Sequence, residues 1–489
     1  MTFTPTPEQL SIVSAATSTK DNLIISALAG AAKTSTLVMV AEALAPQRML
    51  CLAFNKRIAT EMKDRLPPTC EAKTLNSLGH GIWSDVLGKR LEIRTTKSYD
   101  ILSARLDTLP ADEKKEAYGS LADLLEVLRQ GKSSGWIPDA YSRKSNRLLS
   151  DDEFFASTDE KLPDYFQDLI TAVACESLDQ AFAGILDFDD QILLPTIFPA
   201  PFPRYPVVLI DEAQDLSPLN HAMLRKLVGT RRIIAVGDSC QAIYGFRGAS
   251  ASSMKELESA FSMTKLILST SFRCPRSVVE HVRWRAPHMK YPDWAKQGNV
   301  RRWDDWTLDQ IPPNAVVLCR NNAPLFSLAI KMLKASRYPE LVGNDIGKGL
   351  LKIMRKLGKP NLPQDEVLIA IDRWLEEKKS KSRNHGPYLD KAECMYVFAK
   401  QGRTLDDAIS YAEHVFNSQG SIKLMTVHRS KGLEFDSVFI LEEKLIGHEG
   451  QERNLRYVAV TRTKDLLTYI DFEGLDEAPK LASAIPATM

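Results

Sequence analysis

Short apolar runs alternate with longer amphipathic stretches in two zones of the chain, which is the pattern that parallel α/β sheets produce in a sequence. In the first zone this alternation predicts strands at Leu23–Ser26, Met49–Ala53, Cys70–Thr74, Val207–Ile210 and Ile233–Val236. In the second zone it predicts strands in KLILS from Thr264, in Ala315–Leu318, and in the runs IKLMTV, SVFIL and LLTYI. The pattern therefore predicts an α/β protein with two parallel-sheet domains.

Each zone is interrupted by a stretch with helical periodicity and little strand signal. The first interruption contains LADLLEVLRQ and DYFQDLITAVACESLDQAF. The second contains the charge-rich EEKKSKSRNHG, which we interpret as a solvated connection rather than a binding motif. We expect a first sheet domain at residues 1–80 and 185–262, a helical insertion at 81–184, a second sheet domain at 263–345 and 419–489, and a short helical insertion at 346–418.

Composition narrows the class of protein only a little. Hydrophobic residues make up 44% and charged residues 26% of the 489 residues, both ordinary for a globular chain, and no apolar run is long enough to cross a membrane. The seven cysteines lie far apart and never form a C-x-x-C motif, which argues against a zinc site. Their spacing favours a protein of a reducing cytoplasm, either of a bacterium or of a phage-infected host. The net charge of +1 neither favours nor excludes nucleic acid.

The segment SALAGAAKTST at residues 26–36 has the strand, loop and helix start of a phosphate-binding loop, but alanine stands at positions 27 and 32, where the pattern has glycine. If residue 32 needs a positive φ, alanine there costs about 1–2 kcal/mol, which would tune the site rather than abolish it. The phosphate ligands in such loops are backbone N–H groups, the helix N-terminus and the lysine. The predicted loop residues are Ala29, Gly30, Ala31, Ala32, Lys33, Thr34 and Ser35.

The run VVLIDEAQD brings Asp211 and Glu212 to the carboxyl end of a buried strand, where open α/β sheets bind their ligands. Adjacent carboxylates repel each other unless a cation lies near them. In a phosphate-loop enzyme, the first would bind Mg²⁺ and the second would accept a proton from the attacking water.

The run IIAVGDSCQAIYGFRGA has the same construction, because a polar turn carrying Gln241 follows an apolar strand. Tyr244, Phe246 and Arg247 come directly afterwards. Aromatic rings beside an arginine can stack nucleic-acid bases, each stacked base contributing roughly 1–3 kcal/mol, although packing is the alternative interpretation for the rings.

In their order along the chain and in their residues, these segments resemble the motifs of superfamily 1 DNA helicases of the UvrD/Rep/PcrA type. The matching segments are TPEQLSIV, AGAAKT, LAFNKRIATEM, AKTLNSL, ILDFDDQI, LIDEAQD, VGDSCQAIYGFRGA, LSTSFRC, VVLCRNNA, KLMTVHRSKGLEFDSVFI and RYVAVTRTK. The resemblance covers most of the chain outside the two insertions. It implies two RecA-like motor domains that bind ATP in the cleft between them and single-stranded DNA across the top.

For ATP and Mg²⁺, the resemblance implies a set of site residues with separate roles. These are the adenine-reading Gln9, the phosphate-binding Lys33, the Mg²⁺-binding Thr34 and Asp211, the general base Glu212, the γ-phosphate sensor Gln241, the adenine-stacking Phe272, the γ-phosphate arginines Arg273 and Arg462, and Glu434 for ribose or phosphate. Relatives often carry tyrosine at the position of Phe272. Arginines of this kind stabilise transition-state charge and are worth roughly 10³–10⁵ in rate.

For DNA, the resemblance implies contacts that would bind phosphates and bases without reading sequence. The candidate residues are Phe54, Asn55, Lys56, Thr74, Asn76, Tyr244, Phe246, Arg247, Arg320, Asn321, Thr426, His428 and Arg429. Asn76 departs from the family, which often has histidine there. For His428 we favour a DNA contact over a core position, since it follows a predicted strand within TVHRSKG.

The expected function is that of an ATP-dependent single-stranded DNA translocase and DNA helicase in replication, repair or recombination. A 3′-to-5′ direction follows from the resemblance alone, and the short insertions favour translocation over independent unwinding. The expected partners are single-stranded DNA, tailed or forked duplexes and a replication, repair or nuclease protein, with no membrane. The alternative is a DNA-stimulated ATPase sensor that signals to a partner such as a nuclease without unwinding. The complete catalytic set disfavours a nucleotide-binding scaffold without turnover.

Overall fold

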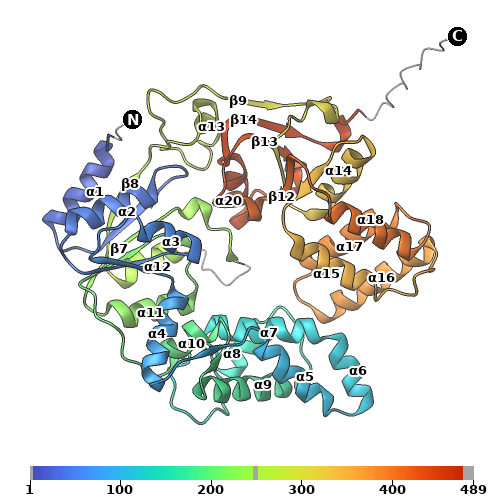
Figure 1. The fold of residues 1–489 in the computed structure, drawn as a ribbon, viewed down its shortest axis with the longest axis horizontal. Coiled ribbons are helices and arrows are strands. Elements are labelled where there is room, and N and C mark those ends of the chain that lie inside the picture. The colour runs from blue at the N-terminus through green and yellow to red at the C-terminus, as the bar shows by residue number, and fades with distance from the viewer. Residues whose placement is uncertain (1–3, 246–251, 477–489) are drawn as a thin grey trace. The chain divides into compact units, whose positions relative to one another are not determined.

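The computed structural model describes residues 4–245 and 252–476 (Figure 1). The chain forms two compact units, of which the first comprises Met1–Ser271 and Lys381–Asn384 and the second Phe272–Ser380 and His385–Met489. Each unit is built on a six-stranded sheet, and the strand pairs in both sheets are parallel. The predicted fold class is thereby confirmed. Among the described residues, none of the helices combines the length and apolar character that a bilayer crossing requires.

The strands of the first sheet are covered by helices on both faces. From edge to edge the order is β3 (Cys70–Lys73), β2 (Met49–Leu52), β6 (Val207–Ile210), β7 (Arg232–Gly237), β1 (Leu23–Ala27) and β8 (Thr264–Leu268). Because side chains alternate across a pleated sheet, Ile25 and Ile24 enter different cores. Helices α1 (Pro7–Ser18), α2 (Lys33–Leu44) and α3 (Lys56–Lys63) close one core, and α4 (Leu75–Leu87), α11 (Pro218–Val228) and α12 (Ser253–Ala260) close the other.

The strand β8 corrects one sequence-based assignment. KLILS is expected to begin the second sheet domain, but β8 pairs in parallel with β1, from Leu23 opposite Thr264 to Ala27 opposite Leu268. The apolar run indicates a strand, whereas the identity of its neighbour depends on where the chain turns afterwards. The other proposed domain boundaries remain a prediction.

The first insertion is a helical bundle with its own core. Its helices are α5 (Lys97–Asp107), α6 (Ala111–Gly119), α7 (Leu121–Ser134), α8 (Asp151–Ser157) and α9 (Asp164–Phe182), and the short strands β4 (Glu92–Ile93) and β5 (Ile185–Leu186) pair beside them. A buried ion cluster joins the bundle to α10 (Asp190–Ile197): Lys97 Nζ lies 2.6 Å from Asp190 Oδ2, and Lys132 Nζ lies 2.8 Å from Asp190 Oδ1. Removing one partner of a buried pair typically costs about 3–5 kcal/mol, so this cluster fixes the bundle beside α10.

The second sheet has two edge strands that the sequence pattern does not reveal. Its order is β11 (Pro339–Leu341), β12 (Ile422–Thr426), β10 (Val316–Cys319), β13 (Phe435–Leu441), β14 (Thr463–Ile470) and β9 (Asn299–Arg302). The edge strand β9 reads NVRR and is largely exposed, and β11 begins with proline. Edge strands tolerate charge and proline, which removes the apolar signal. Helices α13 (Arg276–His281), α19 (Val427–Ser430) and α20 (Gly450–Val460) complete this part of the unit.

The second insertion shares one continuous core with the second sheet. It consists of α15 (Asn344–Met354), α16 (Gln364–Lys381), α17 (Gly386–Ala399) and α18 (Leu405–Phe416), which follow α14 (Asn322–Lys334) and β11. Met354 and Ile371 of the insertion belong to the same buried cluster as Val317 and Leu424 of the sheet. The insertion is therefore an extension of the sheet's helical layer.

The charge-rich stretch EEKKSKSRNHG is only in part a solvated connection. Its first residues complete α16, and Lys381–Asn384 belong to the first unit. Ser382 is buried there, and Arg383 Nη1 donates to the carbonyl oxygens of Ala156 at 2.9 Å and Thr158 at 2.8 Å. These carbonyls lie at the end of α8, where helix carbonyls need outside donors. The composition of the stretch indicates solvation, but its arginine satisfies a helix end.

Candidate functional site

The phosphate-loop segment forms the predicted strand, loop and helix. β1 ends at Ala27, and α2 begins at Lys33 with Ala32 as its N-cap. Gly30 has φ 73°, and Ala32 has φ 57° and ψ 41°, so an alanine occupies the left-handed region. This conformation costs alanine about 1–2 kcal/mol, and such strain is retained where the surrounding structure requires it, often at functional sites. The loop presents the N-terminus of α2, which is a general anion-binding feature.

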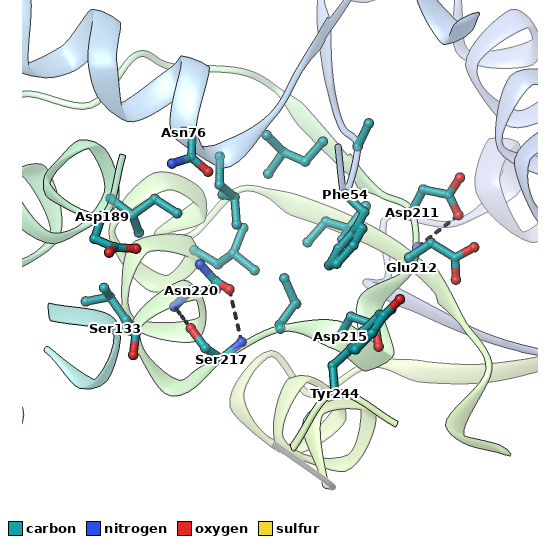
Figure 2. Close-up of a pocket in the computed structure, with 18 of the residues that line it drawn as sticks. Phe54, Asn76, Ser133, Asp189, Asp211, Glu212, Asp215, Ser217, Asn220 and Tyr244 are labelled. Carbon is teal, nitrogen blue, oxygen red and sulfur yellow. Dashed lines mark hydrogen bonds between the residues drawn. The ribbon is translucent and has the colours of Figure 1, made fainter. Parts of the chain in front are cut away.

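Side chains from the loop and from the end of β6 converge. Lys33 Nζ lies 3.4 Å from Glu212 Oε2, and Thr34 Oγ1 donates to Asp211 Oδ2 at 2.8 Å. The backbone N–H of Glu212 donates to Asp211 Oδ1 at 2.9 Å, the contact drawn at the right of Figure 2. Two predicted residues at the start of α2 and two after the end of β6, far apart in the sequence, thus form one constellation.

The electrostatics of this constellation suit a cation. Asp211 is buried, and burial together with the neighbouring Glu212 raises its pKa to about 6, against the opposing effect of Lys33. A carboxylate destabilised in this way gains from a nearby positive charge. Mg²⁺ commonly takes one or two carboxylates, a hydroxyl and substrate phosphates, so Asp211 and Thr34 fit a magnesium nucleotide.

Gln214 connects the general-base candidate to the sensor candidate, a link that the sequence-based interpretation misses. Gln214 Nε2 donates to Glu212 Oε2 at 2.6 Å, and its Oε1 accepts the backbone N–H of Asp238 at 2.9 Å. Asp238 Oδ2 in turn accepts from Gln241 Nε2 at 2.7 Å. A Cβ on Gly237 would lie 2.7 Å from Gln214 Oε1, so glycine makes room for this link. The only signal in the sequence is a polar residue placed shortly after the two carboxylates.

A cavity of about 370 Å³ joins the carboxylates to an aromatic pair. Phe54, after β2, and Tyr244, after β7, stack with ring centroids 6.0 Å apart and planes 3° apart, and Phe54 is 43% exposed. Figure 2 shows Asp211 and Glu212 at one end of the cavity, Phe54 near its middle, and Asn76, Asp189 and Ser133 at the other end. The rings of two predicted DNA contacts therefore open onto the same space as the predicted Mg²⁺ ligand Asp211 and the predicted general base Glu212.

The remaining DNA candidates of the first unit occupy helix starts near this cavity. The side chains of Asn55 and Thr74 are N-caps, which accept the N–H groups of the third residues of α3 and α4. Asn76 Nδ2 donates to the carbonyl oxygen of Phe188 at 2.7 Å, and Lys56 is exposed. The predicted contacts Phe246 and Arg247 lie outside the described residues.

Gln9, the predicted adenine reader, is fully buried and hydrogen-bonded within its own unit. Its Oε1 accepts the N–H of Thr6 at 2.9 Å in a capping box of α1, and its Nε2 donates to Thr36 Oγ1 at 3.0 Å. Gln9 Oε1 also accepts the Thr6 hydroxyl at 3.4 Å, so the second N–H of the Gln9 amide is the group with capacity for a further hydrogen bond. Gln9 therefore fastens α1 to the phosphate-loop helix, and adenine recognition stays a prediction. Ser35, on that helix, accepts from Arg65 Nη2 at 2.9 Å.

In the second unit, two predicted nucleotide residues contact each other. Arg273 Nε donates to Glu434 Oε2 at 2.6 Å, and both side chains are partly exposed. Phe272, beside Arg273, stacks with Trp294 with ring centroids 6.3 Å apart. Trp294 is not among the sequence-predicted residues.

Arg462, the other predicted γ-phosphate arginine, is 1% exposed. Its Nε donates to the carbonyl oxygen of Val458 at 3.0 Å, its Nη1 to that of Leu433 at 3.1 Å, and its Nη2 to Thr461 Oγ1 at 3.2 Å. A phosphate contact would require the guanidinium to exchange some of these acceptors. Its predicted role is untested by these contacts.

The DNA candidates of the second unit differ in their surroundings. Arg320 forms a close ion pair with Glu452, with Nη2 2.8 Å from Oε1. Asn321 and Thr426 stand at the N-caps of α14 and α19. His428 and Arg429 lie within α19 and are half-buried, so His428 is at the strand end where the sequence predicts it.

A phosphate-loop fold, paired carboxylates at a strand end and a second parallel-sheet unit place the chain in the class of proteins with two RecA-like domains. Two family models identify the family: the UvrD/REP helicase N-terminal domain matches residues 6–262, and the UvrD-like helicase C-terminal domain matches residues 400–474. The chain belongs to the UvrD-like helicase family. The resemblance inferred from the sequence motifs is confirmed.

Individual relatives match at low identity. F-box DNA helicase protein 1 of Schizosaccharomyces pombe is 24% identical over 95% of this chain and 57% of its own length. DNA helicase IV of Escherichia coli is 28% identical over 47% of this chain and 40% of its own length. Gabija protein GajB of Bacillus cereus is 26% identical over 55% of this chain and 64% of its own length. The chain thus spans less than two thirds of the length of each of these relatives. Their source organisms include a eukaryote, so the expected bacterial or phage setting of this chain stays a prediction.

Proposed function

We propose that this chain is an ATP-dependent single-stranded DNA translocase and DNA helicase. The observation that carries the proposal is the shared cavity, in which Asp211 and Glu212 open onto the same space as the stacked rings of Phe54 and Tyr244. Nucleotide chemistry and base stacking in one cavity would give a direct route for coupling hydrolysis to the DNA strand. Family membership supports the same conclusion.

The chemistry assigned to the first unit is phosphoryl transfer to water. The N-terminus of α2 and Lys33 would bind the triphosphate, and Thr34 with Asp211 would hold Mg²⁺, which would supply charge neutralisation at the phosphates. Glu212 orients the attacking water and accepts its proton. Gln214 keeps the Glu212 carboxylate in place through its 2.6 Å hydrogen bond and links it to Asp238. In the second unit, Phe272, Arg273, Glu434 and Arg462 are proposed contacts of the same nucleotide.

We propose movement in the 3′-to-5′ direction and a role in replication, repair or recombination, on the basis of the family. The second insertion shares its core with the second sheet, which favours translocation over duplex opening by a freely moving insertion. The proposed substrates are single-stranded DNA and tailed or forked duplexes, and a replication, repair or nuclease protein is the proposed partner.

A DNA-stimulated ATPase sensor is the second candidate function. It is favoured by the similarity to GajB, a relative whose name is not that of a helicase. A sensor would hydrolyse ATP on binding DNA and signal to a partner protein, leaving duplexes intact.

The deciding experiment measures ATP hydrolysis by the full chain with and without single-stranded DNA, with Glu212→Gln as the inactive reference. We expect strong stimulation by DNA that vanishes in the variant. Strand displacement on 3′-tailed and 5′-tailed duplexes then separates the candidates: opening of the 3′-tailed duplex supports the helicase, and two intact duplexes support the sensor. Absence of hydrolysis in every condition would overturn both.

A further inference from the structure

Two aromatic rings of the second unit lie next to each other with one of them in solvent. Trp294 is 71% exposed, the highest value among the large exposed hydrophobic residues of the described chain. Its ring centroid lies 6.3 Å from that of Phe272, and the two planes differ by 24°. A single exposed apolar residue is ordinary, but a nearly parallel ring pair open to solvent is suited to a stacking ligand.

The fold holds the segment that carries Trp294. The backbone N–H of Arg276 donates to the carbonyl oxygen of Lys296 at 2.9 Å, and that of Ser277 donates to Gln297 at 3.0 Å. Arg276 Nε also donates to the carbonyl oxygen of Ala295 at 3.0 Å. These bonds fasten residues 295–297 to the start of α13, only four residues after Phe272. The proximity of the two rings is therefore built into the backbone.

The two rings lie near enough to each other for one planar base to contact both. Stacked bases repeat at about 3.4 Å, so a planar base between two rings separates them by about 6.8 Å. The observed centroid distance of 6.3 Å combines the separation of the two planes with their lateral offset, so a base enters between the rings after the exposed side chain of Trp294 rotates, a motion that exposed side chains make on the nanosecond timescale.

We propose that Phe272 and Trp294 form a two-ring clamp for the nucleobase of a purine nucleoside triphosphate, with Trp294 as a specificity-determining residue. The inference rests on the proposed ATPase, since Phe272 is its predicted adenine platform. The amide of Gln9 already bonds Thr6 and Thr36, which leaves stacking as the larger contribution to base recognition. A two-ring purine covers more of both aromatic faces than a pyrimidine, so the clamp favours purines.

The test compares Trp294→Ala and Trp294→Phe with the wild-type chain in DNA-free steady-state hydrolysis and in equilibrium dialysis with labelled ATP. Loss of a stacked base costs about 5- to 150-fold in affinity, so Trp294→Ala should raise the KM and the Kd for ATP by that factor. The kcat should stay within about twofold, because the chemistry is untouched. Trp294→Phe keeps a ring and should retain most of the affinity. Trp284→Ala removes another partly exposed tryptophan of the same unit and should change nothing.

Tripolyphosphate, which lacks a base, distinguishes the clamp from a general effect on the fold. Its inhibition constant should be the same for wild type and Trp294→Ala, and the preference for ATP over UTP should fall in the variant. Equal weakening of tripolyphosphate, or an unchanged Kd for ATP in Trp294→Ala, would overturn the clamp. A wild-type chain that binds ATP without hydrolysing it would overturn the proposed function alone, since dialysis still tests the clamp. A wild-type chain that binds no ATP would overturn both.

Discussion

Ala32 gives the phosphate loop a measurable strain. Its φ of 57° and ψ of 41° cost an alanine about 1–2 kcal/mol relative to the right-handed region. Glycine carries no such penalty, but its extra freedom in the unfolded chain costs roughly 0.4–1 kcal/mol. The difference predicts that Ala32→Gly raises the free energy of unfolding by about 0 to 1.6 kcal/mol.

The neighbouring Ala31 provides a matched control. It is 2% exposed and is not among the residues with positive φ, so Ala31→Gly loses a buried methyl and gains only backbone freedom. Together these effects destabilise by about 1–2 kcal/mol. Urea unfolding of the full chain, followed by circular dichroism, compares both variants with the wild type. Equal destabilisation by the two substitutions would refute the left-handed assignment of Ala32.

Ala32→Gly also tests whether the strained alanine limits ATP hydrolysis. Relief of 1–2 kcal/mol predicts that kcat and KM for ATP in Ala32→Gly stay within about tenfold of wild type. Lys33→Ala should abolish hydrolysis, because it removes the positive charge at the phosphates. An inactive wild type that Ala32→Gly activates would show that the alanine loop is defective, which would refute the reasoning.

Three further predictions follow from the cavity and its surroundings. Burial, together with the nearby Asp187, raises the pKa of Asp189 to about 6. Between about pH 4 and pH 6 the native state therefore binds a proton that the unfolded chain has already released. The free energy of unfolding should fall as the pH rises through this range. Asp189→Asn should therefore stabilise the chain at pH 7.5, by at most about 3 kcal/mol, with no gain below pH 4 in urea titrations; a gain independent of pH would contradict this. Gln214→Ala should lower kcat about tenfold with little change in KM for ATP, whereas a change in KM alone would argue against positioning of the general base. Phe54→Ala or Tyr244→Ala should weaken single-stranded DNA binding about 5- to 150-fold in fluorescence anisotropy while DNA-free hydrolysis is retained, and unchanged affinity would remove the rings from the DNA path.

The chemistry-bearing segments could be predicted from the sequence because their signals are local. The apolar run before Lys33 gives the strand, the small residues give the loop, and the run before Asp211 gives another strand whose end carries two carboxylates. In a parallel sheet these strand ends meet at one edge, so the contact of Thr34 with Asp211 follows from topology.

The partners of several functional residues could not be predicted, because they depend on tertiary contacts between distant segments. Gln214 meets Asp238 only because β6 and β7 are neighbours. Trp294 meets Phe272 through backbone bonds to α13, which no periodicity encodes. The polar edge strand β9 lacks any apolar alternation, since the edge of a sheet is free to carry charge.

Arg462 shows why a motif assigns chemistry more readily than geometry. A guanidinium is always charged, so its burial at 1% exposure is tolerated only where several acceptors surround it. The carbonyl oxygens of Val458 and Leu433 supply such acceptors at the joint between α20 and β13. The same side chain therefore braces the fold and is also the predicted ligand of the γ-phosphate. Any exchange between these acceptors and a phosphate would couple nucleotide binding to the packing of α20, a link that follows from the contacts of the residue and not from its motif.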